Sequence, residues 1–256
     1  MQSPYPDILF HFTKLAGLKA ILNDQGFRPG YSTETINNNG ADRKFAAPMV
    51  SFCDLRLSEL PTHMRKYGKF GIGMTKEWAL INGLNPVAYV NKNSEFTNNL
   101  LHGLQGIHSL LTAATGLTDY ATANQLNKDY MNLMNVQRYI KNYEGILERK
   151  NKKAKHYRFA DEREWRYVLP LNSVAVWPFV PESDINDPTK KQTHKDLLEP
   201  YRLTYNVSDV KYIIVAAERN VKPMREHIES LVNLSAPDKE HLLARILTAA
   251  QIEADM

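Results

Sequence analysis

Short apolar runs separated by polar turns occupy the first part of the chain and predict strands. Residues 8–12 form the first run, and Thr13 directly after it is positioned to cap a helix whose apolar residues recur at helical spacing until Gly26. The other strand-like runs are residues 48–53, 70–74, 87–90, 164–169, 202–205 and 212–215. Residues 29–47 have no periodicity and are rich in Asn, Gly, Ser and Thr, so we expect a surface loop there.

A different pattern occupies the middle of the chain. From about residue 94 to residue 156 the strand-like alternation disappears and Leu, Met, Asn and Gln recur at helical spacing, which predicts a helical insertion. Two amphipathic helices are expected near the end of the chain, at residues 221–234 and 237–252. This order of elements predicts an α+β fold in a single domain spanning residues 1–256, and it disfavours a doubly wound nucleotide-binding sheet.

Composition narrows the class of protein. A chain of 256 residues with 43% hydrophobic and 23% charged residues is typical of a folded protein with a sizeable core. Its single cysteine, Cys53, excludes an internal disulfide and a zinc site built from several cysteines. No apolar stretch approaches the roughly 18 residues that a membrane span needs, so we expect a cytoplasmic protein without a membrane partner. The net charge of +4 does not by itself argue for nucleic acid.

The strongest candidate for chemistry is the charged segment from Asp161 to Tyr167. If this segment is a strand, its period of two places Glu162, Glu164 and Arg166 on one face. Carboxylates that share one patch raise the pKa of one another or require a cation, and both arrangements are common at functional sites. The alternative is an edge strand that faces solvent, with its acids paired to nearby basic side chains.

Two other segments carry candidate polar groups. His11 lies between two phenylalanines at the end of the first strand and is followed by Thr13; it is either a core histidine or a hydrogen-bonding group for a sugar hydroxyl. Cys53, in an apolar strand, is expected to be a small buried hydrophobe rather than a nucleophile. Tyr67 is either core packing or a stacking platform.

Several other kinds of site are not indicated. His102 and His108 are six residues apart, which does not match a zinc-binding pair, and the remaining histidines have no carboxylate or cysteine neighbour at ligand spacing. We therefore expect no metal. No segment resembles a phosphate-binding P-loop or a serine nucleophile elbow.

Four segments together resemble a known family. Residues 8–26, 48–54, 67–78 and 162–166 are similar to the first component of the AbiG abortive-infection systems, which protect bacteria against phage. The resemblance covers about residues 8–90 and 157–230, and the helical middle carries no matching motif. It implies a role in phage defence, where this component is described as an antitoxin, with a cognate toxin as its partner.

A more distant likeness is to the ADP-ribosyltransferase fold, which implies a small split antiparallel or mixed sheet and NAD as the substrate. His11 and Thr13 resemble the first-strand element and would hold the adenosine ribose. Ser51 stands where a tyrosine is usual, so stacking on nicotinamide passes to Tyr67 or Phe52. The Glu-x-Glu element corresponds to the charged segment, in which the second acid would be catalytic.

The chemistry of that fold gives each residue of the charged segment a role. Cleavage between nicotinamide and ribose develops positive charge at the anomeric carbon, which Glu164 would stabilise. Glu162 would position or deprotonate the acceptor. Arg166 would either counter the diphosphate or hold the two acids ionised.

A basic run before the charged segment suggests a nucleic-acid partner. Its positive side chains would contact a phosphate backbone, or they form a charged face in water. The candidate contacts are Arg149, Lys150, Lys152, Lys153 and Lys155. The first functional hypothesis is thus an NAD-consuming ADP-ribosyltransferase of phage defence that acts on nucleic acid or protein. The alternatives are a non-catalytic antitoxin or sensor and a simple nucleic-acid-binding module.

Overall fold

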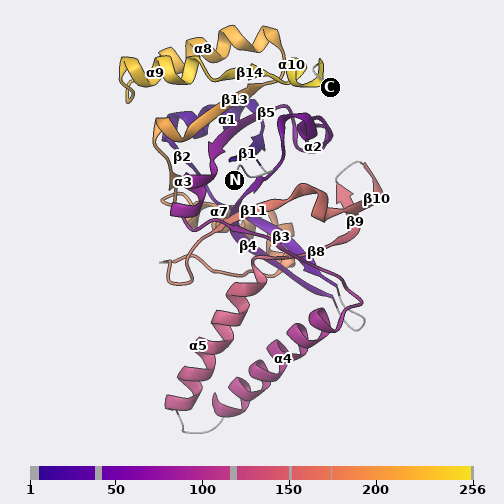
Figure 1. The fold of residues 1–256 in the computed structure, drawn as a ribbon. Helices are drawn as coiled ribbons and strands as arrows, with labels where there is room; N and C mark the ends of the chain where they lie inside the picture. The colour runs from indigo at the N-terminus through magenta and orange to yellow at the C-terminus, as the bar shows by residue number, and fades with distance from the viewer. Residues whose placement is uncertain (1–5, 38–41, 116–119, 150–151, 174, 255–256) are drawn as a thin grey trace.

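A mixed eight-stranded sheet forms the centre of the protein (Figure 1). The computed structural model describes residues 6–37, 42–115, 120–149, 152–173 and 175–254. In this part of the chain the strand order is β14-β13-β5-β1-β4-β11-β6, with β3 also paired to β4, and every pair is antiparallel except β13 with β14. The strands are β1 (Ile8–Thr13), β3 (Gly30–Ile36), β4 (Arg43–Cys53), β5 (Phe70–Thr75), β6 (Asn85–Pro86), β11 (Glu164–Val168), β13 (Val210–Val215) and β14 (Ile246–Thr248). The predicted α+β class is confirmed.

Hydrophobic cores lie on both faces of this sheet because successive strand residues point in opposite directions. In β1, Leu9 packs into the core that contains α1, α3, α8 and α9, whereas Phe10 packs into the core that contains α2 and α10. Both side chains are almost fully buried. The helices are α1 (Leu15–Asp24), α2 (Leu60–Tyr67), α3 (Lys76–Ile81), α8 (Val221–Glu229), α9 (Ala236–Leu243) and α10 (Ala249–Ala254).

The sheet opens between its two central strands. β1 pairs with β5 at six consecutive positions, from Ile8 opposite Thr75 to Thr13 opposite Phe70, but with β4 only where Phe10 faces Cys53. Beyond that pair, no backbone ladder joins β1 to β4; the side chain of His11 contacts the backbone carbonyl of Ser51 instead. This gap is where the candidate site lies.

Helices α4 and α5 form a two-helix arm that extends away from the sheet (Figure 1). Both ends of the arm pass through a short parallel ladder, in which β7 leads into α4 and α5 leads into β8. A third core at the base of the arm joins it to β3 and β4. The elements are β7 (Ala88–Val90), α4 (Glu95–Thr115), α5 (Tyr120–Gln137) and β8 (Ile140–Asn142).

The remaining elements are small and peripheral. A hairpin of β9 (Glu144–Arg149) and β10 (Lys152–Arg158) follows the arm, and β2 (Gly26–Phe27) pairs with β12 (Leu203–Thr204). Two helices, α6 (Glu182–Asn186) and α7 (Pro188–Leu197), follow β11. Asp187 caps α7 by accepting hydrogen bonds from the backbone of Thr189 and Lys190.

Several boundaries differ from the predictions. The expected loop at 29–47 is largely β3 and the start of β4, whose ladder satisfies the backbone of this polar segment. Thr13 belongs to β1, and Lys14 precedes α1 without a side-chain cap. That helix ends at Gln25, which has a left-handed backbone (φ 44°), so Gly26 begins β2.

The insertion is helical only as far as Gln137; the described residues that follow form β8, β9 and β10. The second predicted C-terminal helix is also interrupted. The short strand β14 separates α9 from α10 and adds to the sheet beside β13. In both places strand pairing takes over the backbone hydrogen bonds of a segment that sequence periodicity assigned to a helix.

Candidate functional site

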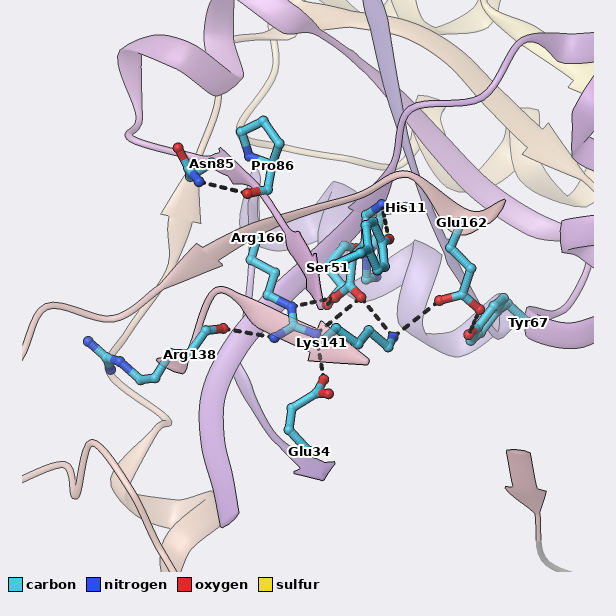
Figure 2. Close-up of polar contacts among 12 residues, drawn as sticks. His11, Glu34, Ser51, Tyr67, Asn85, Pro86, Arg138, Lys141, Glu162 and Arg166 are labelled. Carbon is cyan, nitrogen blue, oxygen red and sulfur yellow. Dashed lines mark hydrogen bonds and ion pairs between the residues drawn. The ribbon is translucent and has the colours of Figure 1, made fainter. Parts of the chain in front are cut away.

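Segments that are distant in the sequence, among them β1, β3, β4, α2 and β8, meet at the gap between β1 and β4. They enclose a pocket of about 220 Å³. The predicted residues on its wall are His11, Ser51, Phe52, Tyr67, Glu162 and Glu164. Figure 2 shows the polar contacts of this region, with His11 and Ser51 close together and Lys141 reaching between the acids.

Glu164 lies at the start of β11 and both of its carboxylate oxygens are occupied. Oε1 accepts hydrogen bonds from Ser51 Oγ at 2.6 Å and from Arg166 Nε at 2.7 Å. Oε2 accepts from Lys141 Nζ at 2.8 Å and from Arg166 Nη2 at 3.2 Å. Burial alone would raise the pKa of Glu164, but the two cations hold it well below its usual range, so the group is ionised.

Arg166 lies beneath the pocket and does not line it. Its side chain is fully buried, and Nη2 donates to Glu34 Oε1 at 2.5 Å while Nη1 donates to the carbonyl of Arg138 at 2.8 Å. The guanidinium thus binds two acids and one backbone oxygen (Figure 2). Its burial lowers the pKa, and the nearby carboxylates of Glu164 and Glu34 more than reverse that effect.

Glu162 faces the same amine as Glu164 from a different element. It ends a 3₁₀ turn (Phe159–Glu162), and the left-handed residue Arg163 (φ 42°) separates that turn from β11. The predicted strand face is therefore wrong for Glu162, although it still lies 3.2 Å from Lys141 Nζ. Its other oxygen accepts a hydrogen bond from Tyr67 at 2.5 Å.

The ring of Tyr67 packs on His63 one helical turn earlier in α2. The centroids are 4.4 Å apart, with 29° between the planes. Burial lowers the pKa of His63 to about 4, so the imidazole is neutral near pH 7. Tyr67 is 37% exposed and both side chains line the pocket, so the pair forms an aromatic wall opposite the central strands.

The side chain of His11 links β1 to β4 where the two strands are not paired through their backbones. Its Nδ1 lies 2.8 Å from the carbonyl of Ser51, and because a carbonyl only accepts, this nitrogen carries the proton. Burial lowers the pKa of His11, so a neutral ring with Nδ1 protonated is favoured. The ring also contacts Phe52, which is buried in the core and packs on Trp78.

Thr13 is not brought to the acidic pocket. It lines a neighbouring hollow of about 290 Å³ between β1 and α1, together with Gly17 and Asp24. His11 borders both cavities. The first strand therefore contributes one predicted residue to the pocket and the other to its neighbour.

The predicted basic contacts lie on the β9–β10 hairpin and not on a helix. Arg149 is in β9, Lys152, Lys153 and Lys155 are in β10, and Lys150 lies outside the described residues. Lys155 is exposed and lines an open hollow of about 590 Å³ with Lys66 and Arg163. Lys66, Lys155 and Arg163 do not line the acidic pocket, whereas His63 borders both hollows.

Sequence reasoning missed four side chains that shape the site. Lys141 and Tyr89 come from β8 and β7 at the base of the arm, and the Glu164 backbone N–H donates to the Tyr89 hydroxyl at 2.8 Å. Glu34 comes from the segment expected to be a loop, and His63 from α2. No spacing pattern in the sequence signals these four residues, because contacts between positions so far apart leave none.

The residues described by the structure contain no group of three or more His, Cys, Asp or Glu side chains placed to hold a metal ion. Among the helices in those same residues, none combines the length and the apolar character needed to cross a lipid bilayer.

Comparisons with known proteins point to phage resistance. Residues 25–216 match the family described as "Putative abortive phage resistance protein AbiGi, antitoxin". The chain is 29% identical over 259 residues to the abortive phage resistance protein AbiGi of Lactococcus lactis subsp. cremoris, and the alignment covers 90% of this chain and 99% of that protein. No solved structure matches. Because the family match spans most of the sequence, this chain belongs to the AbiGi family of abortive phage resistance proteins.

Proposed function

We propose that this chain is the non-catalytic, antitoxin-type component of an abortive-infection system. It would act as the neutralising or sensing partner of a separate toxin. The family description as an antitoxin supports this role. The relative from Lactococcus lactis, aligned over almost its whole length, is described only as an abortive phage resistance protein. The structure supports the same role through the state of the pocket acids.

The observation that carries the proposal is the saturation of Glu164. A carboxylate that stabilises a cation developing at a ribose carbon must present an oxygen to that carbon. Here one oxygen is held by Ser51 and Arg166, and the other already faces the Lys141 ammonium at 2.8 Å. The lysine occupies the position that a reacting cation would need.

The size of the pocket agrees with this role. Its volume of about 220 Å³ lies below the roughly 300–1,000 Å³ of pockets that enclose drug-sized ligands. A small polar group or a single side chain fits this space, whereas a dinucleotide extends beyond it. The pocket is therefore better suited to binding a small group of a partner than to holding NAD as a substrate.

The test combines an enzymatic assay with a growth assay. Purified chain incubated with NAD, alone and with extract of infected cells, should release no nicotinamide above background. Cells expressing the toxin of the same locus should grow when this chain is co-expressed. The variant Glu162→Gln should protect as well as the wild type, because in this proposal the acid performs no chemistry. Nicotinamide release by the wild type, or failure of the wild type to restore growth, would overturn the proposal.

A second candidate is an NAD-consuming ADP-ribosyltransferase that modifies nucleic acid or protein. It is favoured by one observation, the meeting of His11, Ser51, Tyr67, Glu162 and Glu164 on one pocket. In this case Lys141 must leave the acids when NAD binds. The neutral imidazole of His11 would then bind a ribose hydroxyl, and the ionised Glu164 would face the anomeric carbon.

This second candidate predicts a specific pattern of losses. Glu164→Gln should reduce nicotinamide release by about 10²- to 10³-fold, as expected for loss of one preorganised electrostatic group. Glu162→Gln should retain release, at least as hydrolysis. Circular dichroism must show that Glu164→Gln is folded, because this acid belongs to a buried ion cluster. An active wild type with equal losses in both variants would contradict the assigned roles.

A further inference from the structure

The two-helix arm carries almost no charge. Helix α4 has no Asp, Glu, Lys or Arg between Phe96 and Thr115, and α5 has only Lys128 and Asp129, although 23% of the whole chain is charged. Depletion of charged residues is a mark of the buried centre of protein interfaces. An arm that extends into solvent (Figure 1) is an unusual place for such a surface.

An apolar stripe follows the outer side of α4. Phe96, Leu100, Gly103, Ile107 and Leu110 are spaced alternately by four and three residues, so they lie on one face of the helix. Phe96 and Leu110 are 63% and 58% exposed, whereas Leu100 and Ile107 are half-buried and Leu100 also packs against the core at the arm base. The adjacent stripe of α4 faces inward, and its members Leu101 and Leu104 are buried in the core at the arm base.

Gly103 at the centre of the outer stripe has no role in the packing of the single chain. A Cβ atom added there, or at Gly106 one turn on, would meet no atom within 4 Å. Glycine in the interior of a helix is less stable than alanine. A second helix that crosses close to the backbone would give this glycine a function, because interaxial distance depends on the side chains at the crossing.

The stripe is symmetric about that glycine. Phe96 and Leu110 each lie seven residues from Gly103, on opposite sides of it. When two α4 helices cross antiparallel about a two-fold axis at Gly103, Phe96 of each copy faces Leu110 of the other. We propose that the outer stripe of α4 is a dimerisation seam whose occupant is the arm of a second copy of this chain.

The dimensions and charge of the arm are compatible with such a dimer. A helix of 21 residues is about 30 Å long and a pair of helices is about 20 Å wide, so a face that includes α5 beside the seam offers roughly 600 Å² per copy, whereas the seam on α4 alone offers about half of that. Two copies that pair through both helices would bury about 1,200 Å², the lower end of specific interfaces. The seam itself contains no like charges to repel, and the net charge of +4 opposes association only weakly.

The first experiment measures the mass of the full chain in solution. Sedimentation equilibrium should show a rise from 29.3 kDa towards twice that value as the concentration increases. Phe96→Lys and Leu110→Glu should each weaken the dimer at least tenfold, because each places a charge in an apolar seam. Ile81→Glu is the matched control, since Ile81 is 78% exposed on α3 in the body, and it should leave the dimer unchanged.

A second set of variants tests the register. The double variant Phe96→Lys/Leu110→Glu places a lysine of each copy opposite a glutamate of the other, and it should restore much of the association lost in both single variants. Gly103→Leu should weaken the dimer at least tenfold, although a Cβ atom at this position meets no atom within 4 Å in the single chain. Circular dichroism checks that each variant is folded.

Each outcome decides the proposal. A wild-type chain that stays monomeric at all concentrations overturns it, as does a dimer that survives Leu110→Glu. Failure of the double variant to recover association overturns the antiparallel register. A monomeric chain that binds a different protein through this stripe also overturns the assignment to a second copy.

Discussion

The pocket between β1 and β4 and the α4–α5 arm are stabilised in opposite ways. At the wall and floor of the pocket, five ionisable side chains are joined by hydrogen bonds in a cluster of which four members are buried and Lys141 is partly buried. Its members are Glu34, Lys141, Glu162, Glu164 and Arg166. The arm has almost no charge and presents apolar side chains to solvent. Directional contacts fix one geometry in the pocket, whereas the arm retains a surface that a partner can cover.

The two regions meet at the ladder between β7 and β8. Tyr89 in β7 and Lys141 in β8 both contact Glu164, and the carbonyl of Arg138 at the end of the arm accepts a hydrogen bond from Arg166. The position of the acid in the pocket therefore depends on both chain segments that support the arm. A displacement of β7 or β8 at the base of the arm would therefore change the hydrogen bonds of Glu164 directly.

The largest effect is expected from breaking the buried cluster. Arg166→Ala leaves Glu164 and Glu34 buried without their shared cation, so the free energy of unfolding should fall by about 3–5 kcal/mol. Arg158→Ala is the control, because its ion pair with Asp161 is exposed and screened by solvent, so its loss should change the free energy of unfolding much less. Urea denaturation of both variants measures the difference. Similar small losses would show that the cluster does not stabilise the pocket.

The sequence predicted the central strands well because their residues are apolar on both faces. Residues 70–74 and 212–215 lie in β5 and β13, most of whose residues are buried. The sequence did not predict β3, because residues 30–36 are largely polar and form a strand only by pairing with β4. The sequence also failed to predict β8, β9 and β10, where pairing with distant or adjacent strands overrides the helical spacing.

The site was predictable only in part, for a related reason. His11, Ser51 and Glu164 belong to strand segments with local patterns, and β4 brings all three together by pairing with both β1 and β11. The partners that set the charge of the pocket come from far away: Glu34 is 132 residues from Arg166, and Lys141 is 23 residues from Glu164. No periodicity links such positions, so only the folded chain reveals them.

The next largest loss of stability is expected for a buried leucine of α4, compared with an exposed leucine of the same helix. Leu104→Ala removes a side chain that is 1% exposed at the base of the arm, and the resulting cavity should cost about 2–4 kcal/mol. Leu110→Ala, in the same helix, changes an exposed residue and should cost less than about 0.5 kcal/mol in the monomer. Thermal unfolding at a concentration too low for association separates the two. Equal losses would mean that the outer stripe is already covered within one chain.

The smallest effect concerns pH and contrasts a histidine of the site with one of the arm. Burial lowers the pKa of His63 from 6.5 to about 4, so the unfolded chain binds a proton that the folded chain does not. This contribution to stability is complete above pH 6.5 and is lost as the pH falls towards 4; allowing for partial exposure, about 1 kcal/mol should disappear between pH 7 and pH 5. His63→Phe keeps an aromatic ring against Tyr67 and should make the pH profile of unfolding less steep in this range, while the buried His11 still contributes. His102→Gln, at an exposed position on α4, is the control for removing an imidazole outside the site, and an unchanged profile in His63→Phe would mean that this imidazole is not a group that responds.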